Sequence, residues 1–571
     1  MAKPTLSTRA RSADNRIQAW RSALGGRVTA ITSQPQPRAI GTVARARQLQ
    51  SGNFLFGGEL VEAPATAIWD IEQPSDAFTF ALHGFEWLDD LAAAGDAPAR
   101  ALAQDWLWQW IERYGAARGP GWYPDLAGRR LIRWISHAPF LLKGQESQRS
   151  HSFFKSLGRQ TNYLAHAWPD AAQGLPRVEA LTGLLYAALS LEGAEGLLRS
   201  ARRGLAKACE ALDADGAVPS RSPEELLKLF TLLVWADHAQ REAGQPSEAA
   251  QQAAIARIAP TLRGLRMGDG TLARFHGGGR GEEGLLDQSL ADSGIRSAAR
   301  AKTVMGYSRL AAGRTVAIMD AAPPAEGANG LRAHAGTLAF EMSSGRRPMI
   351  VNQGTGDAFG TDWRRHARET SAHSTVEVAG TAMAKFVPMQ SFGCADTETL
   401  TDGPKQVALE RAVDVSGHWA LGSHDGYTAA YGLFHERRLF MTPDGMELRG
   451  EDTMSAQSSR GQARFARMRE TGAVTWRARF HLHPGVQASL DLGGDAVSLT
   501  LRSGEVWIFR QSGGDLTLEP STYLDQRRLN PRLTQQIVVS VAAMDYASRI
   551  KWVVGRAGDR RHAVRDFETD Q

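Results

Sequence analysis

The sequence predicts a multidomain α+β protein, an all-helical half followed by a large antiparallel β-sandwich. Its 571 residues are too many for one ordinary hydrophobic core, so two large domains are expected. From about residue 76 to 266, apolar residues recur every three to four positions, the period of an amphipathic helix. After Gly306 the period becomes two, and no βαβ alternation follows.

The helical half begins with apolar residues at three- and four-residue steps over 78–92 and 102–111. Further helices are predicted over 128–142, 151–167, 177–191, 194–212, 223–242 and 249–265. Ser222 followed by Pro223 is typical of a helix start, because proline is tolerated at the first helical position. Short spacers with Gly, Pro or Asp predict antiparallel helix pairs.

Between the halves, residues 276–281 form a Gly-rich stretch without the Lys-Ser/Thr of a P-loop and without a preceding strand. We interpret it as a loop that crosses between the domains. Strands are predicted over 315–320, 333–341, 348–354, 374–378, 431–440, 474–483, 496–501, 505–509 and 536–541. Turns such as Pro443-Asp444-Gly445 separate them and predict a sandwich.

The composition is that of a soluble globular protein, with 43% hydrophobic and 22% charged residues. No run of about 18 apolar residues occurs, so no transmembrane segment is expected. The two cysteines, Cys209 and Cys394, are far apart and lack CxxC spacing, which argues against a disulfide framework or a thiolate zinc site. We expect two buried thiols.

The net charge of +5 comes from the N-terminus. Residues 1–50 hold nine Lys and Arg against one acidic residue, Asp14, whereas the rest of the chain holds 57 basic and 60 acidic residues. We predict a basic, solvated arm over 1–50 that could contact anionic lipid, nucleic acid or an envelope polymer. No nucleic-acid partner is expected for the remainder. The arm lacks the apolar core of a secretory signal, so the sequence itself does not support export.

Three polar residues accompany the strands between 333 and 378. His334 precedes one strand, Asn352 follows the next, and His373 precedes a third. Adjacent strands would bring these three potential metal ligands to one point. The alternative is that they are ordinary hydrogen-bonded residues at strand ends.

This region resembles the C-terminal part of the heparinase II/III family of polysaccharide lyases. The similar segments are Ala333-His334-Ala335 before Leu338-Ala339-Phe340-Glu341, then Val351-Asn352-Gln353-Gly354, Trp363-Arg364-Arg365, Thr370 to Val376, Ser423 to Tyr427, and His435 to Leu439. In the helical half, Gly174 to Glu179, Asp215-Gly216 with Arg221-Ser222-Pro223, and Gly121 to Pro124 are similar to family segments. The resemblance implies an incomplete (α/α) toroid over 51–290, a β-sandwich over 291–571, and a glycan cleft between them.

The resemblance also implies β-elimination of a uronate glycan, which needs a carboxylate neutraliser, a base and an acid. We assign Arg332 as neutraliser, His334 or His373 as base, and Tyr427 or Tyr307 as acid. Arg332 could instead be a surface residue in a salt bridge. Members that bind zinc use two His and one Asp; here the matching set is His334, Asn352 and His373, and the loss of a carboxylate should weaken a zinc site.

Five residues are predicted to bind the substrate: Trp122, Arg130, Trp134, Glu179 and Arg364. The toroid nevertheless departs from the family pattern. Positions where the family carries Asn, His, His, Glu and Tyr hold Leu175, Pro176, Val218, Ser220 and Glu225. A shifted register would place Asn162-Tyr163-Leu164 in the helix position instead.

Two functions are therefore open. The first is a lyase acting on an acidic, uronate-containing polysaccharide, and the second is a catalytically impaired homologue that binds glycan or serves cell-envelope polysaccharide metabolism. The family implies the cell envelope or periplasm; the absence of a signal peptide makes the cytoplasm the alternative. The sequence predicts no oligomeric state.

Overall fold

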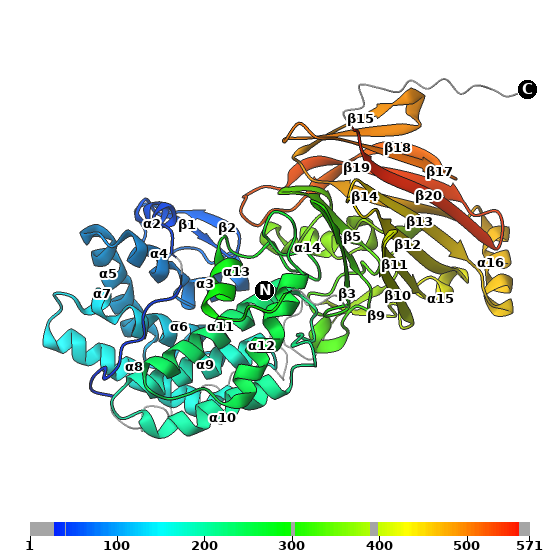
Figure 1. Cartoon of the computed structure of the whole chain (residues 1–571). Coiled ribbons are helices and arrows are strands. Elements are labelled where there is room, and N and C mark those ends of the chain that lie inside the picture. Colours follow the sequence, from blue (N-terminus) through cyan, green and yellow to red (C-terminus); the bar gives the residue numbers. More distant parts are fainter. Residues whose placement is uncertain (1–27, 40, 299–302, 389–397, 559–571) are drawn as a thin grey trace, which may run out of the picture.

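The computed structural model describes residues 28–39, 41–298, 303–388 and 398–558, and shows a helical half beside a two-sheet sandwich (Figure 1). Residues 1–27 of the predicted arm, and Cys394, lie outside the described residues. Within residues 28–50, Val28, Ala46 and Leu49 are buried against the helical half. Cys209 is buried, as expected.

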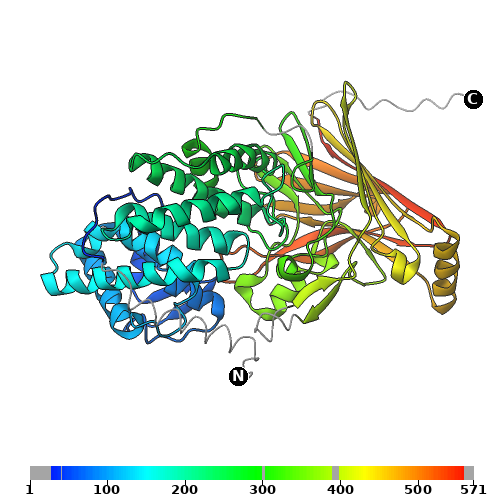
Figure 2. The same ribbon diagram turned by 90° about the horizontal axis from the view of Figure 1, so that it is seen from below.

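The helical half is an incomplete (α/α) toroid whose helices lie side by side, with the sheets on the other side of the molecule (Figure 2). Its helices are α2 (Val43–Gln50), α3 (Asp76–His83), α4 (Glu86–Ala94), α5 (Ala97–Tyr114), α6 (Pro124–Ser136), α7 (Ala138–Leu142), α8 (Ser147–Ala167), α9 (Leu175–Ser190), α10 (Leu198–Glu210), α11 (Pro223–Glu242), α12 (Ala249–Gly264) and α13 (Leu285–Asp292). A hairpin of β1 (Asn53–Phe56) and β2 (Glu59–Glu62), which the periodicity did not predict, packs beside α2 and α3.

Helix α9 is the centre of the toroid because it is buried almost all round. It crosses α6 at two glycines. A Cβ at Gly128 would lie 2.3 Å from the carbonyl oxygen of Glu179, and one at Gly183 would lie 2.4 Å from the Cα of Gly128. Only glycine permits so close an approach of two backbones.

The sandwich consists of two antiparallel sheets. The first has the order β10 (Val407–Asp414), β11 (Gly417–His424), β12 (Phe434–Met441), β13 (Glu447–Ser455), β20 (Ala547–Arg556), β17 (Val506–Ser512), β16 (Ala496–Leu501) and β15 (Val486–Asp491). The second has the order β18 (Asp515–Tyr523), β19 (Arg532–Ala542), β14 (Thr475–Leu482), β6 (Arg347–Val351), β5 (Phe340–Ser344), β4 (Thr315–Asp320) and β3 (Tyr307–Ala312), with β7 (Val376–Val378) also on β14.

Shorter elements complete this half. They are a ribbon of β8 (Lys385–Pro388) and β9 (Glu398–Thr401), and helices α14 (Thr361–Ala367), α15 (Thr428–Tyr431) and α16 (Ser459–Thr471). Helix α16, which the sequence pattern did not predict, lies at the end of the sandwich far from the helical half (Figure 1). Among the described residues, none of the helices combines the length and apolar character that a membrane span requires.

A buried ion pair holds the sandwich to the loops that precede β5 and β7. Asp452 of β13 accepts from Nε of Arg437 at 2.7 Å, Nε2 of His435 at 2.9 Å and Nε1 of Trp552 at 2.9 Å. Arg437 also donates from Nη1 to the carbonyl oxygens of Leu338 at 2.8 Å and Ser374 at 2.7 Å. Burial opposes the charged carboxylate, but Arg437 and His435 hold the pKa of Asp452 well below its usual range.

Replacing Asp452 by Asn should lower the free energy of unfolding by about 3–5 kcal/mol, because Arg437 would keep a buried charge without a counterion. Urea unfolding measures the change. The matched control is Asp402→Asn, since Asp402 forms an exposed pair with Lys385 that is worth less than about 1 kcal/mol. Equal effects of the two substitutions would contradict the role of Asp452.

Buried neutral histidines should make the fold sensitive to acid. Burial lowers the pKa of His83 to about 3, of His373 to about 4 and of His481 to about 3. The unfolded chain takes up these protons near pH 6.5, so their stabilising contribution is present above about pH 6.5 and is lost as the pH falls towards about 4. The unfolding temperature should fall over this window.

Substitution of His481 by Gln should make that fall shallower. Substitution of the exposed His166 by Gln should leave it unchanged. An unfolding temperature that is constant between pH 7 and 4.5 would contradict the assignment.

Candidate functional site

His334 lies in the loop before β5, and His373 lies in the loop before β7. Their side chains meet on the side of the second sheet that faces the helical half. His334 Nδ1 and His373 Nε2 are 3.0 Å apart, and the two side chains are 5% and 2% exposed. Arg368, which the sequence reasoning did not single out, holds the His334 loop by donating to the carbonyl oxygens of Ala333 at 2.9 Å and Gly330 at 3.1 Å.

The hydrogen-bond partners assign the protons of this pair. His373 Nδ1 lies 2.7 Å from the carbonyl oxygen of Glu369, so this nitrogen must donate. Burial lowers the pKa of His373 to about 4 and that of His334 well below its ordinary value, so both rings are neutral at pH 7. His373 Nε2 therefore accepts from His334 Nδ1. It follows that His334 Nε2 carries a lone pair, and no hydrogen-bond partner for it occurs among the described residues.

A second histidine, His276 of the Gly-rich crossing loop, supports His334 from the helical side. The backbone N–H of His334 donates to His276 Nδ1 at 3.2 Å, so the His276 proton lies on Nε2, 3.0 Å from Asp320 Oδ2. Arg221 of the helical half pairs with the other oxygen of Asp320. Burial opposes ionisation of Asp320, yet Arg221 and His276 keep its pKa below the usual value. We call Arg221, His276, Asp320, His334 and His373 the histidine network.

Sequence reasoning placed His276 in a crossing loop but gave it no role, and it missed Asp320 and a chemical role for Arg221. The available signal was local. His276 directly precedes Gly277, and Asp320 follows the apolar run from Val316 to Met319. Neither feature identifies a partner far away in the chain.

Four non-glycine residues around this network have a left-handed backbone conformation. Arg221, His276, Met305 and Leu338 have φ values of 58°, 47°, 52° and 62°. Arg221 donates from Nε to the carbonyl oxygen of Met305 at 3.2 Å. The backbone N–H of Leu338 donates to the backbone carbonyl oxygen of Asp320 at 2.8 Å. Left-handed non-glycine residues cost of order 1–3 kcal/mol each and persist where their surroundings hold them. Such a cluster is typical of a functional site.

Two partly exposed arginines, Arg332 and Arg364, lie near the network. Arg332 donates from Nε to Asp357 Oδ2 at 3.1 Å, and Arg364 Nε lies 3.3 Å from Asp357 Oδ1. Asp357 raises the pKa of Arg332. Arg332 therefore forms a salt bridge, and its role as neutraliser stays a prediction. Two guanidinium groups share one carboxylate, which leaves one positive charge uncompensated within this trio.

The structure brings together only two of the three predicted zinc ligands. The nitrogens of His334 and His373 are close, but Asn352 Oδ1 accepts from the Ser374 N–H at 3.0 Å, and Arg274 donates to the Asn352 carbonyl oxygen at 2.5 Å. A guanidinium beside Asn352 disfavours a cation there. Within the described residues, no three His, Cys, Asp or Glu side chains gather in a metal-binding group. The residues present fit zinc poorly.

The structure argues against both proposed acids. Tyr427 is 1% exposed and donates its hydroxyl proton to the carbonyl oxygen of Val376 at 2.7 Å. Tyr307 is equally buried, and its hydroxyl group donates to the carbonyl oxygen of Arg221 at 2.6 Å. Burial raises the pKa of both phenols well above the ordinary value.

Four of the five predicted substrate-binding residues belong to the toroid core. Trp122 and Trp134 are 4% and 0% exposed, so neither presents a face to a sugar. Arg130 is fully buried over the Trp110 ring and donates to Gln160 at 2.6 Å. Glu179 is buried and accepts from Arg129. These four side chains are therefore not open to a ligand in this structure, whereas the side chain of Arg364 is 35% exposed and pairs with Asp357.

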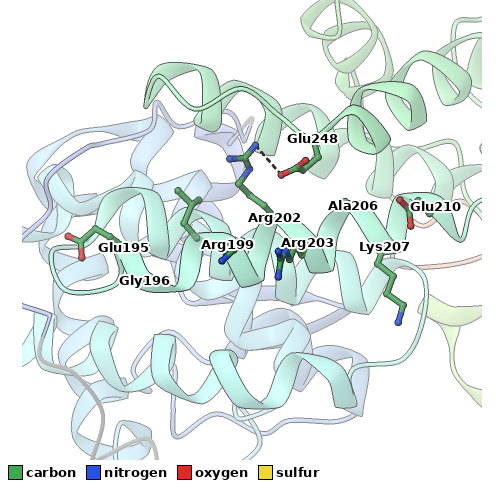
Figure 3. Close-up of a pocket in the computed structure, with 10 residues that line it drawn as sticks. Glu195, Gly196, Arg199, Arg202, Arg203, Ala206, Lys207, Glu210 and Glu248 are labelled. Carbon is green, nitrogen blue, oxygen red and sulfur yellow. Dashed lines mark ion pairs between the residues drawn. The ribbon is translucent and has the colours of Figure 1, made fainter.

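An open hollow of about 930 Å³ lies along α10, away from this network (Figure 3). Four basic and three acidic residues line it: Arg199, Arg202, Arg203, Lys207, Glu195, Glu210 and Glu248. Arg202 pairs with Glu248 at 3.1 Å. No member of the histidine network lines this hollow, and its mixed charges favour no one ligand.

Comparison with known proteins agrees with this fold. The family model described as "Heparinase II/III-like, C-terminal" matches residues 295–553. FtsZ-localized protein C of Caulobacter vibrioides is 30% identical over 540 residues, which cover 92% of this chain and 90% of that protein.

Two solved structures share the architecture. A crystal structure of heparinase III matches with a TM-score of 0.70 at 12% identity, covering 95% of this chain and 89% of that one. A mutant of the heparan sulfate lyase HepC from Pedobacter heparinus matches with a TM-score of 0.57 at 14% identity, covering 96% and 88%. At these identities the structures show the toroid and sandwich alone. The chain belongs to the heparinase II/III-like family.

Proposed function

We propose that this chain is a polysaccharide lyase that binds a uronate-containing glycan at the cleft and removes the C5 proton with His334. One observation carries the proposal. The chain of hydrogen bonds from His334 through His373 to the Glu369 carbonyl oxygen leaves His334 Nε2 unprotonated at neutral pH. A general base needs a free lone pair held in place.

The surface beside His334 also supplies a positive charge. Arg332 and Arg364 share Asp357, and the Arg332 side chain is 48% exposed. A uronate carboxylate that reaches Arg332 would be neutralised by a fork of two N–H donors, which makes the adjacent C5 proton more acidic. The uronate carboxylate would compete with Asp357 for these two N–H donors of Arg332.

His334 Nε2 takes the C5 proton, the C5–H electron pair forms the C4–C5 double bond, and the C4–O bond breaks with its electrons on the leaving oxygen. Because Tyr307 and Tyr427 are buried and donate to backbone carbonyls, the proton for that oxygen would come from His334 itself or from water. Turnover should therefore be slow.

A second candidate is a lyase-fold protein that acts with FtsZ without turnover. The 30% identity to FtsZ-localized protein C over 92% of the chain favours it, as do the buried tyrosines. In that case the cytoplasmic alternative for localisation would hold, in place of the envelope or periplasm.

A panel of uronate polysaccharides, including heparan sulfate, tests the first candidate through the ultraviolet absorbance of the new double bond. The His334→Gln variant should lose at least about 100-fold in rate, as expected for loss of a general base. The matched control is His366→Gln, because His366 lies exposed on α14. The wild-type rate should not fall between pH 8 and pH 6, since burial already keeps His334 unprotonated.

No absorbance on any polysaccharide would refute the lyase. Co-sedimentation with FtsZ polymers under the same conditions would then support the second candidate.

Zinc at His334 and His373 stays a prediction that metal analysis can decide. Both facing nitrogens would have to be unprotonated to bind a metal, whereas the neutral pair places one proton between them. We expect well below one zinc per chain in protein purified without chelators. One zinc per chain that is lost in His373→Ala would contradict the proton assignment.

A further inference from the structure

Two exposed aromatic rings touch each other on the surface of the toroid. Phe80 of α3 is 37% exposed, and Tyr123, the residue before α6, is 43% exposed. Their ring centres are 5.6 Å apart, and the ring planes are inclined by 67°. This edge-to-face contact covers only part of each ring, so both rings keep a side that is open to solvent. We call Phe80 and Tyr123 the aromatic pair.

The exposure of this pair is not shared by its neighbours in the chain. Phe78 is fully buried and Trp122 is 4% exposed, so both pack in the core of the toroid. Among the described residues, the other two exposed aromatic side chains are Trp419 and Tyr546 of the sandwich. Trp419 stacks on Phe440 of the adjacent strand, an arrangement that stabilises a sheet. The aromatic pair lies in no such strand ladder.

Arg129 of α6 lies near the end of α3, and its charge is already neutralised. A Cβ at Gly84, the residue after α3, would lie 3.7 Å from Cδ of Arg129. The guanidinium group donates to the two oxygens of Glu179 at 2.8 and 3.0 Å and lies 3.7 Å from Oε1 of Glu86. This part of the toroid therefore has no spare positive charge for an anionic group.

Carboxylates border the pair instead. The side chain of Glu86, at the start of α4, is 48% exposed, and Asp125, two residues after Tyr123, is half-buried. Burial opposes the charge of Arg129, but Glu179, Asp125 and Glu86 raise its pKa, so all three carboxylates lie close to it. Carboxylate oxygens accept hydrogen bonds from sugar hydroxyl groups, and an aromatic ring contacts the apolar face of a pyranose. This combination suits an uncharged sugar and repels an anionic one.

The turn of the β1–β2 hairpin connects α3 to the sandwich. A Cβ at Gly57 would lie 2.8 Å from the backbone of α3, and a Cβ at Gly58 would overlap the side chain of Ala358. Ala358 follows Asp357, the partner of Arg332. Only this turn separates the start of α3 from the segment that binds Arg332. A polysaccharide bound there extends over several sugars, so the same chain can contact α3.

We propose that the aromatic pair binds an uncharged sugar ring of the polysaccharide, whose apolar face stacks on Phe80 or Tyr123 while its hydroxyl groups donate to Glu86 and Asp125. This inference rests on the glycan-binding part of the proposed function and adds to it a sugar that carries no charge.

Titration of the full chain with an uncharged hexamer of β-1,4-linked N-acetylglucosamine, followed by saturation-transfer NMR, tests the proposal without any need for turnover. Phe80→Ala and Tyr123→Ala should each weaken binding about fivefold, because each removes one stacking ring. Tyr123→Phe keeps the ring and should bind as the wild type does. The matched control is Tyr546→Ala, because Tyr546 is 49% exposed on the sandwich beside α16.

Weaker binding by both alanine variants, with Tyr123→Phe and Tyr546→Ala unchanged, would support the sugar site. No binding of the hexamer to the wild type, or equal binding by the wild type and the alanine variants, would overturn it. Double-bond formation from a uronate polysaccharide in that case would leave the lyase standing. Conversely, hexamer binding that depends on both rings, without double-bond formation from any polysaccharide, would leave the sugar site standing while the base role of His334 failed.

Discussion

The site depends on the burial of one carboxylate. Asp320 is 1% exposed, and a buried charge costs several kcal/mol unless it is paired and hydrogen-bonded. Its partners come from two other parts of the chain, Arg221 from the helical half and His276 from the crossing loop. Because His276 in turn accepts from the His334 backbone, the position of His334 depends on the docking of the two halves.

A second buried ion pair holds the same loops. Asp452 and Arg437 are both fully buried, and Arg437 uses its remaining donors on the loops that carry His334 and His373. Two buried ion pairs therefore hold the two histidines in place. This arrangement fixes the imidazole of His334 and keeps it neutral beside Arg332 and Arg368.

In the helical half, aromatic and arginine side chains of the kind that bind glycans pack in the protein core instead. Trp122, Trp134 and Arg130 were predicted to bind substrate because they resemble a family segment, but they pack against one another and against Trp110. Such packing stabilises the toroid and removes these side chains from any ligand. Four of the left-handed non-glycine residues, Arg221, His276, Met305 and Leu338, instead lie around the histidine network.

The sequence by itself determined the order of helices and strands, because a period of 3.6 or 2 is a local property that burial of one face imposes. β4 and α11 match their predicted spans. The pairing of β6 and β7 with the distant strand β14 could not be read from the local pattern around His334 and His373. Only the tertiary structure decided which polar side chains serve the site. Arg221 lies 99 residues from Asp320, and His276 lies 58 residues from His334. The burial of Tyr427 likewise depends on a carbonyl 51 residues away. Such partners are chosen by packing between distant segments, and no local pattern carries that information.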